Sequence, residues 1–342
     1  SKRVVLIDSK FRQNVLKSSD KAPGFNDREF NTDFTLDLSE PLVDVVSIRI
    51  SSVQIPTTWY AFDHHLGNTS FSTNGSTYEC LNIEPGNYDL EQLGAAIQAK
   101  DPSFNLSINY ETQKASIWGT DSSFVFYKKG GLIDCSHTCV GGSFVNQNLG
   151  WNLGFRRVDA SGELSSVNLV NDPSLAITAD VPANIYGPKY FLLELNDYNQ
   201  AQINSGIVSV ADRSSSITAI NTGANRGSNQ DKLTKAQMYS QNAMLSKNSD
   251  KPNTSDRVYG PVSKDVLAFI PLDDIDRTSK HHPPHGQTPP LIEDVTDVNV
   301  PRVYSGPVKI DKLRIRLLDD KGNLVNLHDN DWSFTLIVEQ LH

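Results

Sequence analysis

The sequence is poor in cysteine and methionine and has no long hydrophobic run. Its three cysteines, Cys80, Cys135 and Cys139, are too few and odd in number for a disulfide scaffold. We therefore expect reduced thiols in a soluble protein made inside the cell. No apolar stretch approaches the ~18 residues of a membrane span, and the apolar part of residues 1–8 is too short for a secretory signal.

A basic surface is lacking as well. The chain has 31 Lys and Arg against 40 Asp and Glu, which gives a formal net charge of −9. Because sequence-independent binding of nucleic acid requires a basic face, we expect no direct contact with nucleic acid. A hydrophobic content of 38% with ordinary amounts of glycine and proline also excludes disordered and collagen-like chains.

Motifs of catalysis are absent: there is no Gly-x-Ser-x-Gly, His-Glu-x-x-His, Walker loop or Gly-x-Gly-x-x-Gly. The segment Cys135-Ser-His137-Thr-Cys139 offers soft ligands to zinc, but a closed site needs four ligands and no second cysteine pair exists. The other candidates have spacings typical of turns and exposed loops, namely His64 and His65 beside Asp63, His281, His282 and His285 beside prolines, and Asp273, Asp274 and Asp276. We therefore predict no enzymatic activity and no catalytic, metal-binding or cofactor-binding residue.

Alternation of polar and apolar residues predicts strands at both ends of the chain. In 45–56 the apolar parity changes after Ile50, which predicts a bulge near Ser51 and Ser52, and Pro56 ends the strand. The parity of the apolar residues changes in the same way at 311–312. The strands predicted in these parts of the chain are 33–38, 45–56, 190–195, 265–271, 307–318 and 331–338, of which 190–195 is of the buried type.

Between the early and late strands lies a segment of different character. Strands are predicted at 70–73 and 78–83, joined by an Asn74-Gly75 hairpin turn, and later at 104–110, 114–118 and 124–127. A helix over 85–99 carries Leu90, Leu93 and Ile97 on one face, with Asn87 or Asp89 as its cap. Together these elements predict a small α+β module.

These patterns predict a mainly β protein, a jelly roll or β-sandwich whose first and last strands are neighbours. The β domain is expected to comprise residues 1–62 and 185–342. It is interrupted by the α+β insert and an irregular connection over 63–184. A long polar excursion over 196–264, with one helix near 231–246, lies within the second part.

The order of several segments along the chain carries a resemblance. They are Leu-Ile-Asp-Ser-Lys-Phe-Arg (6–12), Thr-Asp-Phe-Thr-Leu-Asp-Leu (32–38), Val-Ser-Ile-Arg-Ile (46–50) running to Ile-Pro-Thr-Thr-Trp-Tyr (55–60), Pro-Gly-Asn-Tyr (85–88), Leu-Gly-Trp-Asn-Leu-Gly-Phe (149–155), Tyr-Phe-Leu-Leu-Glu-Leu-Asn-Asp-Tyr (190–198), the tail 303–322 and Trp-Ser-Phe (332–334). This set resembles minor capsid and penton-type structural proteins of large nucleocytoplasmic DNA viruses, in the chlorovirus and mimivirus direction.

The resemblance implies a jelly-roll capsid component without enzymatic activity or cofactor. Such a protein is assembled into an icosahedral particle in the host cytoplasm and is found in the virion. Its partners would be the major capsid protein and other minor capsid proteins. A penton would in addition form a closed homo-pentamer around a vertex, through heterologous contacts.

Aromatic residues near irregular segments are the candidates for an interface, because aromatics are enriched at assembly interfaces. They are Trp59, Tyr60, Trp151, Phe155 and Tyr198, and core packing is the competing interpretation for each. The alternative function is that of a carbohydrate-binding β-sandwich, which requires an exposed aromatic platform near polar loops. A hydrolase, the third possibility, would require a bound metal with three or more protein ligands.

Overall fold

The computed structural model describes residues 1–12, 31–73, 79–119, 123–128, 148–156, 163–164, 167–168, 172–203, 265–272, 291–294 and 300–341. The chain divides into two compact units. The first consists of Ser1–Val208 together with Ser263–His342, and the second is Ser209–Val262. The second unit, with the helix predicted near 231–246, lies outside the described residues.

The protein is mainly β, as the alternation predicted, and its largest sheet has seven antiparallel strands. Their order is β1-β16-β2-β15-β12-β13, and β14 also pairs with β2. The strands are β1 (Lys2–Asp8), β2 (Asp33–Ile55), β12 (Tyr190–Asn196), β13 (Val266–Pro271), β14 (Leu291–Asp294), β15 (Arg302–Asp319) and β16 (Ser333–Gln340). Strands from both ends of the chain therefore share one sheet.

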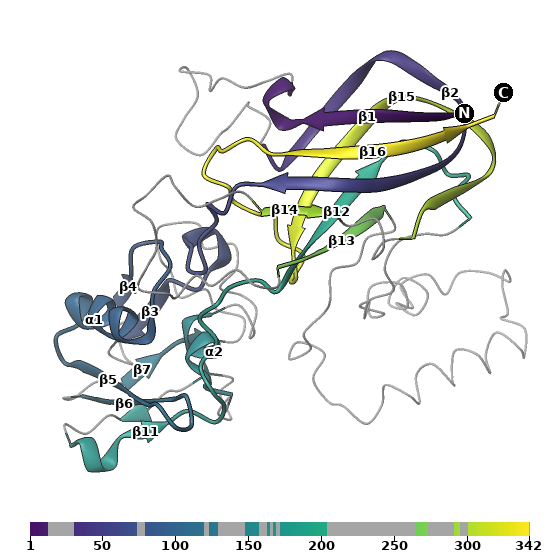
Figure 1. Ribbon diagram of the computed structural model, residues 1–342. Helices are drawn as coiled ribbons and strands as arrows, with labels where there is room; N and C mark the ends of the chain where they lie inside the picture. Colours follow the sequence, from purple (N-terminus) through teal and green to yellow (C-terminus); the bar gives the residue numbers. More distant parts are fainter. Residues whose placement is uncertain are drawn as a thin grey trace, which may run out of the picture. The chain divides into compact units, whose positions relative to one another are not determined.

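Two long strands, β2 and β15, curve from one layer of the sandwich into the other (Figure 1). The N-terminal part of β2 pairs with 312–316 of β15, whereas its C-terminal part pairs with β16. The separate strands predicted at 33–38 and 45–56 are thus one strand. Pro41 does not break it, because Pro41 lies in the bend between the paired residues Asp37 and Leu42, where no ladder hydrogen bond is required.

Both layers contribute to one hydrophobic core. Phe34 and Ile48 from β2 pack in the same buried cluster as Phe191 from β12 and Phe334 from β16. The predicted early strand 45–56 pairs with the last strand, β16, so that early and late strands are neighbours, as predicted. The strand β1, which was not predicted, pairs with the other side of β16 from Lys2↔Glu339 to Asp8↔Ser333. Among the described residues, β1 thus forms one edge of the sheet.

Local irregularities lie where the sequence predicted them. Thr335 pairs with Ser52 and Leu336 with Ile50, so Ser51 is the extra residue of a bulge. The predicted slip at 311–312 coincides with the register shift between Ile310 and Lys312. The strand β2 ends immediately before Pro56.

The segment between β2 and β12 has a hydrophobic core of its own, drawn from side chains between Ala61 and Ile185. Two small sheets have the orders β10-β7-β3-β4 and β11-β6-β5, and β8 pairs with β9. The helix α1 (Leu90–Lys100) begins at a capping box of Asp89 and Gln92 and buries Leu93 and Ile97. The other elements are β3 (Ser70–Thr73), β4 (Glu79–Asn82), β5 (Phe104–Asn109), β6 (Lys114–Gly119), β7 (Ser123–Val125), β8 (Tyr127–Lys128), α2 (Leu149–Leu153), β9 (Glu163–Leu164), β10 (Val167–Asn168) and β11 (Ile177–Thr178).

The strands predicted at 70–73 and 78–83 do form a hairpin, since β3 pairs with β4 from Ser70↔Asn82 to Thr73↔Glu79. The turn residues Asn74 and Gly75 lie outside the described residues. None of the helices in the described part of the chain has the length and apolar character that a membrane crossing requires.

Candidate functional site

The five aromatic residues that were predicted to lie at an interface differ widely in exposure. Trp59 and Phe155 are buried core residues, Trp59 against Phe191 of β12 and Phe155 stacked on Phe126 of the insert. Both side chains therefore offer almost no surface that a partner protein could contact.

Tyr60, Trp151 and Tyr198 reach the surface. Tyr60 packs against the ring of His328, with 4.0 Å between the ring centroids. The guanidinium of Arg156 lies 3.8 Å from the centre of the Trp151 ring and covers it, so that this aromatic face is occupied within the chain. Tyr198 is the most exposed of the five and follows β12 in a left-handed conformation.

The adjacent histidines His64 and His65 point to different partners, as expected for neighbouring residues. His64 Nδ1 contacts Thr69 Oγ1 at 2.8 Å, whereas His65 Nε2 contacts the carbonyl oxygen of Leu324 at 3.1 Å. Nowhere in the described ranges do three or more His, Cys, Asp or Glu side chains gather in a way that could hold a metal ion. The segment Cys135–Cys139, the histidines at 281–285 and the aspartates at 273–276 lie outside those ranges.

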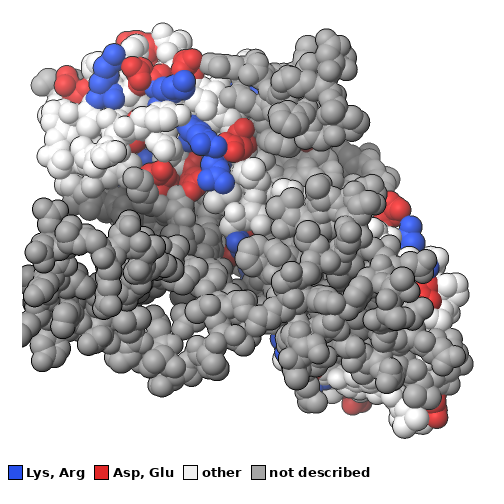
Figure 2. Space-filling model, turned by 180° about the vertical axis from the view of Figure 1, so that it is seen from behind, with Lys and Arg blue, Asp and Glu red and all other residues white. Residues whose placement is uncertain are grey.

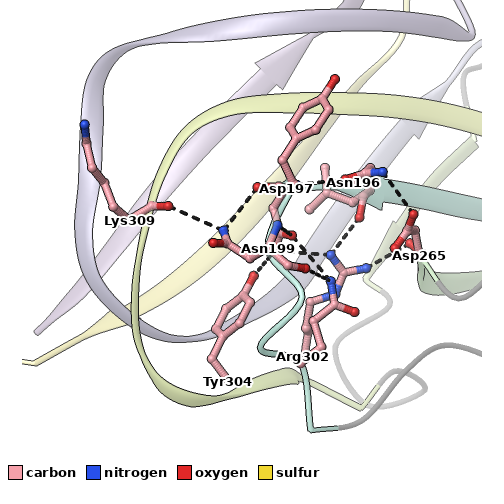
Figure 3. A network of polar contacts seen from close by, with 10 residues as sticks. Asn196, Asp197, Asn199, Asp265, Arg302, Tyr304 and Lys309 are labelled. Atoms are coloured by element: carbon pink, nitrogen blue, oxygen red, sulfur yellow. Dashed lines mark hydrogen bonds and ion pairs between the residues drawn. The ribbon is translucent and has the colours of Figure 1, made fainter.

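A buried network of charged and polar side chains lies where β12 ends and β13 begins (Figure 3). Asp197 Oδ2 accepts a hydrogen bond from the hydroxyl of Tyr304 and lies 3.5 Å from Arg302 Nη1. Its Oδ1 accepts from the backbone N–H of Asn199 at 3.0 Å. Burial and the hydrogen bond to Asp197 raise the pKa of Tyr304, so the phenol stays protonated and remains a donor.

Arg302 links this network to the backbone on both sides. Nη1 donates to the carbonyl oxygen of Leu195 at 2.6 Å, and Nη2 donates to that of Asp265 at 2.8 Å. Leu195 N also donates to Asp265 O at 2.9 Å, and Ile203 N donates to Val303 O at 2.9 Å. One guanidinium therefore joins the chain before 204 to the chain after 264.

Sequence reasoning missed this network. Arg302 and Tyr304 lie two residues apart on one strand, which places them on the same face, and Asp197 directly follows a buried strand. Both of these signals are present in the amino-acid sequence. The contact itself depends on the pairing of residues 201–203, after β12, with the start of β15, and has no counterpart in the local pattern.

The edge strand β1 exposes hydrophobic side chains. Val5 and Ile7 point into the main core, while Val4 and Leu6 on the opposite face are 71% and 70% exposed. Phe11, just after the strand, is exposed to the same degree. β1 is the last strand of its sheet among the described residues, so its outer row of backbone N–H and C=O groups has no strand partner in that part of the chain.

Charged side chains at the surface are largely paired. Arg314 binds Asp33 through two hydrogen bonds of 3.1 Å, and Arg316 Nη1 donates to Glu194 Oε2 at 2.8 Å. Figure 2 shows basic and acidic side chains side by side on the face that it draws. This pairing leaves no large area of a single sign among the described residues on that face.

No protein-family model matches the chain, and no curated protein matches it in sequence. Among solved structures, the penton protein of mavirus aligns over 100% of both chains with 11% identity and a TM-score of 0.35. A chain in the 3.5 Å structure of the Sputnik virophage aligns over 98% of both chains with 12% identity and a TM-score of 0.36. At TM-scores this low, neither similarity carries an argument about function.

Proposed function

We propose that the chain is a structural component of an icosahedral virus capsid, a minor capsid or penton protein, that acts through protein–protein interfaces. Its partners would be the major capsid protein, other minor capsid proteins and, at a vertex, further copies of itself in a pentamer. It would assemble in the host cytoplasm and reside in the virion. The ordered set of sequence segments motivates this proposal, and one observation on β1 supports it most directly.

That observation is an apolar strand with one uncovered face. The run Val4-Val5-Leu6-Ile7 is of the type found in strands that are buried on both faces. The sandwich covers only one of these faces, because Val4 and Leu6 remain about 70% exposed. Complete removal of such a side chain from water is favourable by about 1.5–3 kcal/mol. The edge of β1 that has no strand partner among the described residues could add backbone hydrogen bonds. The strand is therefore suited to contact another protein.

The charge of the chain agrees with a protein partner. The surface pairs of Arg314 with Asp33 and of Arg316 with Glu194 neutralise basic side chains that could otherwise bind phosphate. The net charge of −9 disfavours nucleic acid as a direct partner. Among the predicted aromatics, Tyr198 has the exposed ring that an interface requires.

The first test is the mass of the purified protein in solution, measured by light scattering behind a sizing column. We expect a pentamer for the wild type and smaller species for Leu6→Lys. Leu175→Lys is the matched control, because Leu175 lies in the insert, outside the main sheet, with a similar exposure of 61%. It should leave the mass unchanged.

If the wild type is monomeric, its binding to shells of the major capsid protein is measured by co-sedimentation. Binding that Leu6→Lys weakens and Leu175→Lys does not would support a minor capsid protein. A monomer that does not bind these shells would contradict the proposal.

A further inference from the structure

We infer that a second copy of this chain binds on the outer face of β2, where Arg49 of one copy pairs with Asp44 of the other. Both residues lie on β2, and each has exposed apolar side chains beside it. The inference rests on the proposed function, because it names the residues through which copies of the chain would contact each other.

Arg49 lies on the outer face of the layer in which Figure 1 shows β1, β16 and β2 side by side. Its neighbours Ile48 and Ile50 point into the main core, so the side chain of Arg49 points to the opposite face. The register places Arg49 opposite Ile337 of β16, and Ile337 opposite Val4 of β1. The guanidinium thus ends a row of apolar side chains, of which Val4 is largely exposed.

The side chain of Arg49 forms no hydrogen bond or ion pair with any described residue. Every other arginine in the described ranges forms at least one. Its Nε is shielded from solvent and has no acceptor in that part of the chain. Because an unsatisfied guanidinium N–H is costly at a contact surface, this position favours a partner that brings a carboxylate.

The nearby carboxylate of Glu339 is already engaged by other groups. Glu339 Oε2 accepts from Ser47 Oγ at 3.0 Å, and its Oε1 lies 3.3 Å from Lys2 Nζ. Hydrogen bonds from Ser47 and Lys2 lower the pKa of Glu339 most, and the charge of Arg49 contributes least. Glu339 therefore does not satisfy Arg49.

Asp44 carries the opposite charge in a similar setting. It is exposed, has a φ of 55°, and its side chain forms no hydrogen bond or ion pair with a described residue. Val43 before it is 51% exposed. Leu341, whose N donates to the carbonyl oxygen of Asp44 at 2.9 Å, is 54% exposed. The carboxylate is thus held beside two apolar side chains that reach solvent.

Arg49 and Asp44 cannot pair within one chain. They are five residues apart on one strand, and an extended strand rises about 3.3 Å per residue, so about 16 Å separates their backbones. Two copies are free of this restriction. A chain with a net charge of −9 also presents more carboxylates than cations to a neighbouring copy, which makes a second copy complementary to an unpaired arginine.

The apolar neighbours give this pair its strength. Water screens an ion pair that remains exposed, whereas apolar contacts around a central arginine exclude water from it. Val43 and Leu341 of one copy would supply such contacts to Val4 of the other. In a pentamer the contact is heterologous, because a different patch of each copy takes part, and it repeats around the ring.

The test is an exchange of the two charges. Light scattering at a series of protein concentrations gives the concentration at which the assembly dissociates. Arg49→Asp and Asp44→Arg should each raise this concentration about tenfold or more, because each brings like charges together. The double variant Arg49→Asp with Asp44→Arg forms the pair in reverse and should return the concentration to within about threefold of the wild type.

Arg49→Asp combined with Glu111→Arg is the matched control. It has the same net charge as the exchange variant, but Glu111 is an exposed residue of the insert, between β5 and β6. It should not restore the assembly. Thermal unfolding verifies that each variant is folded. If Arg49→Asp does not fold, Arg49→Met removes the charge and should likewise raise the dissociation concentration.

The outcomes separate this inference from the capsid proposal. A pentamer that the single variants leave unchanged, or that the exchange does not restore, would overturn the inference and leave the capsid proposal intact. A monomeric wild type would also overturn it, and binding to shells of the major capsid protein then decides the capsid proposal. A dimer that responds to the exchange would support the inference and contradict a pentamer.

Discussion

Arg302 and Asp197 form a buried ion pair in which neither side chain reaches solvent appreciably. Their side chains are 3% and 0% exposed, and Arg302 Nη1 lies 3.5 Å from Asp197 Oδ2. The guanidinium of Arg302 makes its shortest hydrogen bonds to two backbone carbonyls, those of Leu195 and Asp265. The ion pair therefore connects strands and does not face an open cavity. Its contribution to the free energy of unfolding can be tested.

Removal of Asp197 should be costly. Asp197→Ala would leave Arg302 buried without its carboxylate, and breaking a buried pair in this way costs about 3–5 kcal/mol in the free energy of unfolding. Urea unfolding measures the loss. The double variant Asp197→Leu with Arg302→Met should recover a large part of it, because no uncompensated charge remains.

The exposed pair of Lys309 and Asp311, 3.6 Å apart, is the control for this experiment. Because solvent screens exposed pairs, Asp311→Ala should leave the unfolding midpoint nearly unchanged. Equal effects of Asp197→Ala and Asp311→Ala would contradict a special role for the buried pair.

The same network predicts that residues 204–264 can be removed. Arg302 binds the backbone before and after this segment, and Ile203 N donates to Val303 O, so both ends are held by the sandwich itself. We expect that a short Gly/Ser linker in place of 204–264 preserves a cooperative unfolding transition with a similar midpoint. Circular dichroism during thermal unfolding measures it.

Two comparisons between the full and the shortened chain test this prediction further. Arg302→Met in the full chain should cost less than Arg302→Met in the shortened chain, because the short linker relies on the ends being held at fixed positions. Loss of cooperative unfolding in the shortened chain alone would show that the sandwich needs the removed residues.

Much of the fold follows from local pattern. The alternation in β2, the change of parity at Ser51, the stop at Pro56 and the cap at Asp89 are all short-range signals, and each is found in the structure. Such signals report which way a side chain points and where an element ends. They depend on backbone geometry that neighbouring residues determine.

Contacts between distant segments could not be predicted in this way. Trp59 lies in the core because Phe191 of β12 packs against it, and no feature near residue 59 indicates that strand. The same applies to Asp197 and Arg302, which meet only after residues 201–203 pair with the start of β15. Residue type indicates that an aromatic side chain will be packed against something, but the partner is set by topology.

The insert should be sensitive to a single methyl group at Gly150. A Cβ there would lie 2.6 Å from atoms of the Phe126 ring, which is itself stacked on Phe155. Overpacking of this kind costs about 1–3 kcal/mol. Gly150→Ala should therefore increase hydrogen exchange of backbone amides in the insert, measured by mass spectrometry, with little change in the sandwich.

Gly306→Ala is the matched control, because a Cβ at that position meets no atom within 4 Å. It should leave exchange throughout the chain unchanged. Increased exchange in the sandwich with Gly150→Ala would contradict the separation of the two hydrophobic cores.

The bulge at Ser51 makes a prediction about deletions within β2. Ile50 and Val53 both point into the core although they are three residues apart, because Ser51 is the extra residue between two paired positions. Deleting Ser51 would place Val53 two residues after Ile50, which is the spacing of a regular strand. Every inward side chain would keep its face, so this deletion should retain a folded protein.

Deletion of Arg49 is the opposite case in the same strand. Ile48 and Ile50 would become adjacent and point to opposite faces. In the part of β2 either before or after the deletion, the apolar side chains would then point to solvent. We expect this variant to be insoluble or unfolded, whereas the variant without Ser51 shows a thermal transition within a few degrees of the wild type. Tolerance of both deletions would mean that the register between β2 and β16 is not set by the inward face.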